Sequence, residues 1–283
     1  MPGLGWLDVS NLDFYALLLL EPLHAACLAE REPSEAMGTA LAAHPALRWY
    51  LARIHPPIQP YLEACLALGQ DHPTPNAVRQ AERAVLDSMQ DWLIYVLDPA
   101  KYDQLEFLKW EDSSLLSMAD FTGKIVLDIG SGTGRLAFTV APYAGTVYAV
   151  EPVANLRRYL WVKRAKLGLE NVYPSDGLLT QIPFADNFAD ILMAGHVFGD
   201  DFDAEYAEMR RVVRDGGMIL LHPGTNANSE DDAHQYLVSQ GFTHDTFEEP
   251  GALTGRFADG LKRKYWQTIH KPYQPKEESH DPG

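Results

Sequence analysis

The stretch VLDIGSGTGRLA, residues 126–137, constrains the fold of this 283-residue chain more than any other. An apolar run ends at Asp128, and glycines follow at 130, 132 and 134 before a helical pattern begins. Glycine has no β-carbon, so such a turn lets the backbone touch a ligand at the carboxyl edge of a sheet, where open α/β folds bind. We interpret the stretch as a nucleotide-binding turn rather than an ordinary one, because Glu151 ends the next predicted strand and a carboxylate there suits a ribose diol.

Strand patterns and helix patterns alternate after this point, which predicts an α/β fold with a Rossmann-like, mostly parallel sheet and helices on both faces. The expected strands are 124–130, 146–151, 172–176, 189–195 and 218–223, and the expected helices are 134–143, 153–167, 204–213 and 231–240. The segments FTHDTFEEP and LKRKYWQTIH then follow without a long helix between them, so we expect a closing antiparallel strand pair.

Before residue 119 the pattern is helical throughout. Apolar residues recur at three- and four-residue spacing over 77–97, which predicts one long amphipathic helix, and prolines divide the shorter helical segments before it. We therefore expect an all-helical region over residues 1–118, a ligand-binding α/β domain over 119–271 and a flexible, polar tail over 272–283.

Composition excludes several classes of partner. The formal net charge of −16 disfavours nucleic acid, since nucleic-acid affinity depends on Lys and Arg. The basic stretch LKRKYW, 261–266, is interpreted as a strand with solvated charges rather than a binding patch. The longest apolar run, 15–20, is far shorter than the ~20 residues of a membrane span. With no signal-like N-terminus and with Cys27 and Cys65 expected as free thiols, we predict a cytoplasmic protein whose oligomeric state the sequence leaves open.

Two other nucleotide-binding motifs fit poorly. The dinucleotide fingerprint G-x-G-x-x-G needs its third small residue where this chain has Arg135, which disfavours a nicotinamide-dependent oxidoreductase. A phosphate-binding Walker loop needs Lys and Ser or Thr after the glycines, and these are missing.

Four separated motifs resemble those of class I S-adenosylmethionine-dependent methyltransferases, in the broad group that includes the ubiquinone and menaquinone biosynthesis C-methyltransferases. The motifs are VLDIGSGTG at 126–134, the pair Glu151-Pro152, SDGLLTQIPFADNFADIL at 175–192 and EMRRVVRDGGMILL at 208–221. The similarity covers about residues 122–225 and continues through the last strand pair to about residue 269. It does not extend to the helical region over residues 1–118, which the resemblance implies to be a lid that recognises the substrate. It implies S-adenosylmethionine as the cofactor and a small molecule as the methyl acceptor.

The resemblance also implies roles for residues at matching positions. The turn formed by Gly130, Ser131, Gly132 and Gly134 would wrap the homocysteine and ribose, with Asp128 near the methionine amino group. Glu151 would accept both ribose hydroxyls. The adenine would lie between Pro152 with Val153 on one face and a slot made by Asp176, Gly177 and Leu178. A turn or helix-capping role for Asp176 is the alternative.

His196 follows the fourth predicted strand and is the candidate general base, because an unperturbed histidine pKa of about 6.5 allows proton transfer near neutral pH. A contact of His196 with the cofactor, or a purely structural role, is the alternative. Asp200 and Asp201 are interpreted as a helix cap rather than a metal site. Trp110, Glu111 and Asp112 would either close over the cofactor or form an apolar hinge.

The sequence thus predicts a methyltransferase acting on a small-molecule acceptor of unknown atom type. A non-catalytic S-adenosylmethionine-binding protein with a regulatory or partner-binding role is the alternative, and a protein acceptor stays open.

Overall fold

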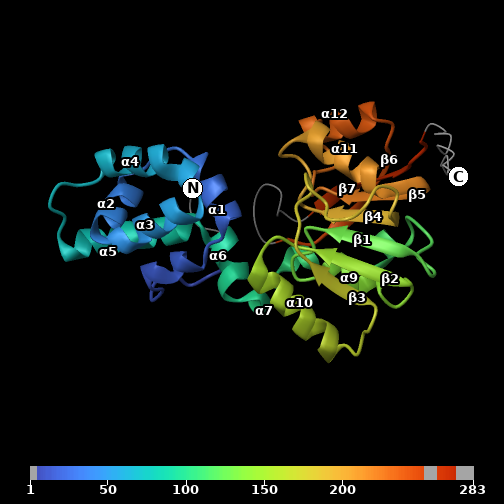
Figure 1. Ribbon diagram of the computed structural model, residues 1–283, viewed down its shortest axis with the longest axis horizontal. Helices are drawn as coiled ribbons and strands as arrows, with labels where there is room; N and C mark the ends of the chain where they lie inside the picture. The colour runs from blue at the N-terminus through green and yellow to red at the C-terminus, as the bar shows by residue number, and fades with distance from the viewer. Residues whose placement is uncertain (1–4, 252–259, 272–283) are drawn as a thin grey trace, which may run out of the picture. The chain divides into compact units, whose positions relative to one another are not determined.

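The computed structural model describes residues 5–251 and 260–271, which form two compact units (Figure 1). The helical unit contains the described residues up to Lys109 together with Pro152–Lys163, and the sheet unit contains Trp110–Glu151 and the described residues from Arg164 onward. The first boundary between the units lies at 109/110, nine residues before the expected boundary at 118/119. The segment Pro152–Lys163, which follows Glu151 in the chain, groups with the helical unit. The expected tail, 272–283, lies outside the described residues.

The helical unit consists of short helices divided largely at prolines. Its elements are η1 (Phe14–Leu19), α1 (Pro22–Ala29), α2 (Glu35–Ala43), α3 (Pro45–Ile54), η2 (Pro56–Ile58), α4 (Gln59–Leu68), α5 (Pro75–Ser88), α6 (Gln90–Leu97), α7 (Pro99–Tyr102) and η3 (Glu106–Leu108). Proline is favourable in a first helical turn because the amide it lacks would have no partner there. Side chains supply other caps: Ser34 accepts from the Met37 amide and Thr74 from the Ala77 amide.

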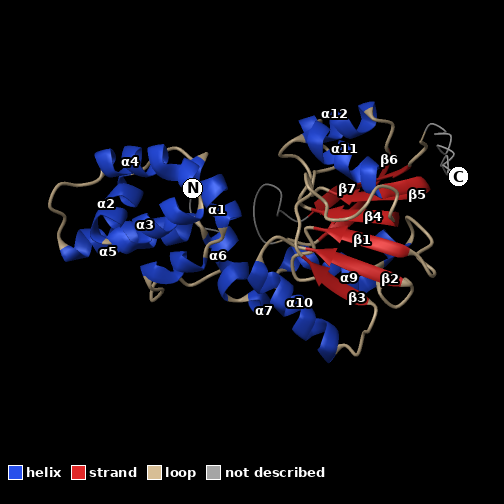
Figure 2. Ribbon diagram, viewed as in Figure 1, coloured by secondary structure: helices blue, strands red, loops and turns tan. Residues whose placement is uncertain are grey.

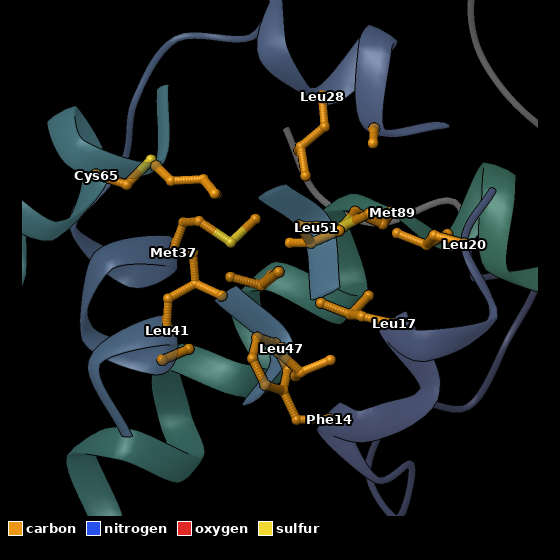
Figure 3. Close-up of a cluster of buried hydrophobic side chains, with 14 of the residues drawn as sticks. Phe14, Leu17, Leu20, Leu28, Met37, Leu41, Leu47, Leu51, Cys65 and Met89 are labelled. Atoms are coloured by element: carbon orange, nitrogen blue, oxygen red, sulfur yellow. The ribbon is translucent and has the colours of Figure 1, made fainter. Parts of the chain in front are cut away.

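Figure 3 shows the core of this unit, where side chains of η1 and α1–α6 meet. Phe14, Leu17, Leu41, Leu47 and Leu51 are each at most 1% exposed. Burial of aliphatic and aromatic side chains on this scale gives the helical unit a hydrophobic core of its own. Cys65 is part of that core, and no disulfide joins it to Cys27.

The long helix expected over 77–97 is wrong, because the chain breaks at Met89 into α5 and α6 (φ −117°, ψ 14°). Arg31 donates to the Ser88 carbonyl, an acceptor that a continuous helix would use for the Trp92 amide. The Ser88 hydroxyl also bonds back to the Val85 carbonyl, a contact that bends helices. Both of these hydrogen bonds are made by Ser88. Neither alters the apolar spacing from which the long helix was predicted.

The sheet unit holds a single seven-stranded sheet of order β3-β2-β1-β4-β5-β7-β6 (Figure 2). Its strands are β1 (Ile125–Ile129), β2 (Thr146–Val150), β3 (Val172–Ser175), β4 (Ala189–Gly195), β5 (Val213–His222), β6 (Thr243–Glu249) and β7 (Gly260–Thr268). Neighbours among β1–β5 pair in parallel, and β7 pairs antiparallel with both β5 and β6. The expected parallel sheet and closing antiparallel pair are confirmed.

The helices of the sheet unit are α8 (Ser113–Leu116), α9 (Arg135–Val140), α11 (Phe202–Val212) and α12 (Asp232–Ser239), and α10 (Ala154–Lys166) belongs mostly to the helical unit. Side chains of α11 and α12 share a core with Leu127 and Ile129 of β1. Asp128 lies between these two residues in β1, and its carboxylate accepts a hydrogen bond from the Ala137 amide of α9. Since alternate strand residues face opposite sides, α9 and α11 cover opposite faces of the sheet.

No helix within the described part of the chain is both long enough and apolar enough to span a membrane.

Candidate functional site

The glycine turn lies at the carboxyl end of β1, between β1 and α9. Gly130, Gly132 and Gly134 all have positive φ (67°, 55° and 86°), a backbone region that glycine reaches at little cost. A β-carbon on Gly130 would lie 2.4 Å from Val197 Cγ1, so glycine at this position also lets the segment behind β4 approach the turn. The chain order reverses between β1 and β4, and open α/β folds bind ligands at such switch points.

Glu151, directly behind β2, faces this turn. Its Oε2 accepts from the Gly132 amide at 2.9 Å, and the residue is 4% exposed. The Glu151 amide donates to the Ser175 carbonyl at 2.9 Å, so the ends of β2 and β3 are held together. The structure thus places a buried carboxylate against the glycine backbone. A carboxylate so placed is a strong acceptor for hydroxyl groups.

Asp128 lies beneath the turn and is fully buried. Its Oδ2 accepts from the Ala137 amide at 2.9 Å, and its Oδ1 has no hydrogen-bond partner among the described residues. Burial raises the pKa of Asp128 to about 7, the hydrogen bond from Ala137 opposes this shift, and the nearby charge of Glu151 adds to it. Asp128 therefore holds the first turn of α9, a structural contact that sequence reasoning had not included.

Asp176, Gly177 and Leu178 follow β3, next to the end of β2. A β-carbon on Gly177 would lie 2.8 Å from Val150 Cγ1 and 2.6 Å from Pro183 Cδ, so only glycine fits this approach. Leu178 is 39% exposed and makes a bridge to Gln181. The turn that follows β3 therefore lies close to the end of β2, directly before Glu151.

Pro152 and Val153 group with the helical unit. Val153 is 3% exposed, and it packs with Val96 and Leu156. The Ala154 amide that follows donates to Glu21 Oε1 at 2.7 Å. The segment directly behind Glu151 is thus fixed by helical-unit side chains that sequence reasoning did not identify.

His196, the candidate base, follows β4 with a positive φ of 60°, which is uncommon for a residue with a side chain. Its amide donates to the His222 carbonyl at 2.8 Å, and its Nε2 lies 3.0 Å from Glu249 Oε2. A β-carbon on Gly224 would lie 2.5 Å from the His196 ring. The His196 ring therefore lies between the Glu249 carboxylate at the end of β6 and Gly224, which follows β5.

His222 ends β5 and lies in an aromatic cluster. Its ring stacks on Trp110, with centroids 5.1 Å apart, and meets Phe247 edge to face. Burial lowers the pKa of His222 to about 3, with smaller electrostatic contributions from Lys264 and Arg135 among its neighbours, so the ring is neutral at physiological pH. The Arg135 guanidinium lies over the Trp110 ring, 4.1 Å from its centroid. Trp110 is 6% exposed and is part of this packed cluster.

Asp201 caps α11, as expected: its Oδ1 accepts from the Ala204 amide at 3.1 Å. The basic stretch in β7 is a strand, as expected, but its charges are not solvated. Lys262, Arg263 and Lys264 are 0%, 6% and 7% exposed. Protein oxygens accept hydrogen bonds from these groups and so replace water: Asn226 Oδ1 from Lys262, Ala227 O from Arg263 and Ser114 O from Lys264.

Comparisons with known proteins agree with this geometry. Residues 127–221 match a family model described as a methyltransferase domain. An uncharacterized methyltransferase of Geobacillus thermodenitrificans is 29% identical over 199 residues, 66% of this chain and 84% of that protein. A ubiquinone/menaquinone biosynthesis C-methyltransferase of Cupriavidus metallidurans is 36% identical over 105 residues, 35% of this chain and 42% of that protein.

Among solved structures, a SAM-dependent methyltransferase from Aquifex aeolicus aligns with a TM-score of 0.46 and 19% identity, over 60% of this chain and 97% of that chain. The family match and the sequence relatives, together with the sheet and its glycine turn, define an enzyme that transfers methyl groups. Over residues 127–221 the chain is therefore similar to known methyltransferases, as its motifs led us to expect.

Proposed function

We propose that this methyltransferase acts on a small-molecule acceptor and holds S-adenosylmethionine along the glycine turn, with the ribose hydroxyls on Glu151. The observation that carries the cofactor assignment is the contact between Glu151 Oε2 and the Gly132 amide. This contact puts a buried acceptor beside backbone that has no side chain, and an adenosyl group needs both. The residues therefore fit the cofactor.

The remaining cofactor roles follow from position. Ser131 belongs to the same turn, and its hydroxyl donates to the Asp128 carbonyl at 2.7 Å, which supports the bend on which the homocysteine part would lie. Asp128 would act on the methionine amino group from beneath the turn. Asp176 would accept from the adenine amine, with Gly177 and Leu178 beside it, and Pro152 would contact the adenine directly after Glu151 in the chain.

Bound S-adenosylmethionine supplies an electrophilic methyl group on a sulfonium, and transfer is an in-line displacement that depends chiefly on positioning. His196 lies behind β4 at the same edge of the sheet and is the proposed general base for an acceptor that must lose a proton. Glu249 orients its ring through Nε2. We favour a small acceptor over nucleic acid because the net charge of −16 repels phosphate backbones.

The function is tested by incubating the protein with S-adenosylmethionine labelled on its methyl group and a panel of phenols, quinols, amines, thiols and carbon acids. We expect label in a low-molecular-weight product, and much less of it with the Glu151→Ala variant when the cofactor concentration is near the wild-type Kd. Label confined to added protein or nucleic acid would contradict the small-molecule proposal. Cofactor binding without transfer to any acceptor would favour a non-catalytic binding protein.

A further inference from the structure

The start of α10 is held in place by a carboxylate from a distant part of the sequence. Glu21 Oε1 accepts from the Ala154 amide at 2.7 Å, although the two residues are 133 positions apart. The first amides of a helix have no partner within the helix and carry partial positive charge, so a carboxylate is a favourable partner for them. Ala154 comes three residues after Glu151 in the chain.

Glu21 is itself fixed. It caps α1, and its own amide donates to His24 Nδ1 at 3.0 Å. His24 is buried, and this burial lowers its pKa to about 4, so the ring is neutral at physiological pH and Nδ1 can accept the proton. The N-cap position and the hydrogen bond to His24 therefore fix the backbone of Glu21, from which its carboxylate reaches the Ala154 amide.

Other helical-unit residues fasten the same segment further along. Asn155 donates to the Val96 carbonyl at 2.6 Å. Asp103 accepts from the Tyr159 hydroxyl at 2.9 Å and from Lys163 Nζ at 2.7 and 2.8 Å. Residues 154–163 are thus attached to helical-unit side chains and backbone at both ends.

We propose that Glu21 is a positioning residue for S-adenosylmethionine. By holding the Ala154 amide it fixes the first turn of α10, and with it Pro152 and Val153, the residues proposed to flank the adenine. This inference rests on the proposed function, because it takes the adenine to lie beside Pro152. Glu21 acts through the Ala154 backbone and does not touch the cofactor.

The test measures the affinity for S-adenosylhomocysteine by calorimetry and the hydrogen exchange of the peptide containing Ala154, in Glu21→Ala, Glu21→Gln and the control Glu30→Ala. Glu30 ends the same helix, is exposed and lies outside the segment's contacts. We expect Glu21→Ala to weaken binding by about threefold to tenfold and to speed exchange at Ala154, as loss of a helix cap should. Glu21→Gln should have a smaller effect, and Glu30→Ala none.

Wild-type affinity in Glu21→Ala, despite faster exchange at Ala154, would overturn the inference and leave the proposed function intact. A wild-type protein that binds no S-adenosylhomocysteine would overturn both. If Glu21→Ala does not fold, Asp103→Asn decides, because it loosens the same helix at its other end. Unchanged affinity in that variant would also contradict the inference, and weaker binding would support it.

Discussion

His196 Nε2 lies 3.0 Å from Glu249 Oε2, and the Glu249 side chain has no solvent exposure. The contact joins the residue behind β4 to the last residue of β6, two strands that are not neighbours in the sheet. A buried carboxylate without a partner is costly, so this hydrogen bond is needed to keep Glu249 in place.

Replacing Glu249 with alanine removes that partner from the His196 ring. We expect the free energy of unfolding to fall by about 0.5–1.5 kcal/mol, the usual net contribution of one hydrogen bond. Urea denaturation followed by tryptophan fluorescence measures this. Glu248→Ala is the control, because Glu248 is the exposed neighbour on the other face of β6. Equal stabilities of the two variants would show that the contact contributes nothing.

Gly224 and Gly216 form a matched pair for the packing of His196. Both have positive φ (77° and 71°), but a β-carbon at 224 would lie 2.5 Å from the His196 ring, and one at 216 would meet no atom within 4 Å. Gly216→Ala should therefore cost only backbone strain, about 1–2 kcal/mol. Gly224→Ala should cost about 1–3 kcal/mol more, because the ring must move. The difference between their melting temperatures measures this, and no difference would mean that the ring yields freely.

His222 predicts a pH dependence of stability. Its pKa falls from 6.5 to about 3 on folding, because burial disfavours the charged ring. Between these values the unfolded chain binds a proton that the folded chain does not, so stability falls as the pH drops below 6.5. From about pH 7.5 to about pH 5 the loss from this residue should be about 2 kcal/mol. His222→Phe retains an aromatic ring against Trp110 and should lose that much less over the same range. Parallel stability curves for the two proteins would refute the assignment.

The sequence predicted what depends on local pattern. The strand ending at Asp128, the glycines behind it and the acid at Glu151 are read from short-range periodicity and backbone needs, and the structure places them together. It also predicted the antiparallel pair at the end of the sheet, since two strand patterns without a helix between them favour a hairpin.

What the sequence did not predict depends on pairing between distant segments. Glu249 meets His196 only because β7 inserts between β5 and β6 and sets the register of β6. Lys264 can be buried because its ammonium group donates a hydrogen bond to the Ser114 carbonyl, and no local pattern identifies that carbonyl. Likewise, the sequence shows that Val153 is apolar and needs an apolar neighbour, but it does not identify Val96 as that neighbour.

Ribose binding by Glu151 is central to the proposed function, and one calorimetric comparison tests it most directly. S-adenosylhomocysteine and its 2′,3′-dideoxy analogue are titrated into the wild type, Glu151→Ala and the control Glu170→Ala, whose side chain is exposed. We predict that Glu151→Ala weakens binding of the natural nucleoside by about tenfold to a hundredfold, as loss of hydrogen bonds to a charged group should. The loss should nearly vanish for the dideoxy analogue, and Glu170→Ala should bind as the wild type does. Wild-type affinity in Glu151→Ala, or an equal loss for both ligands, would contradict the account.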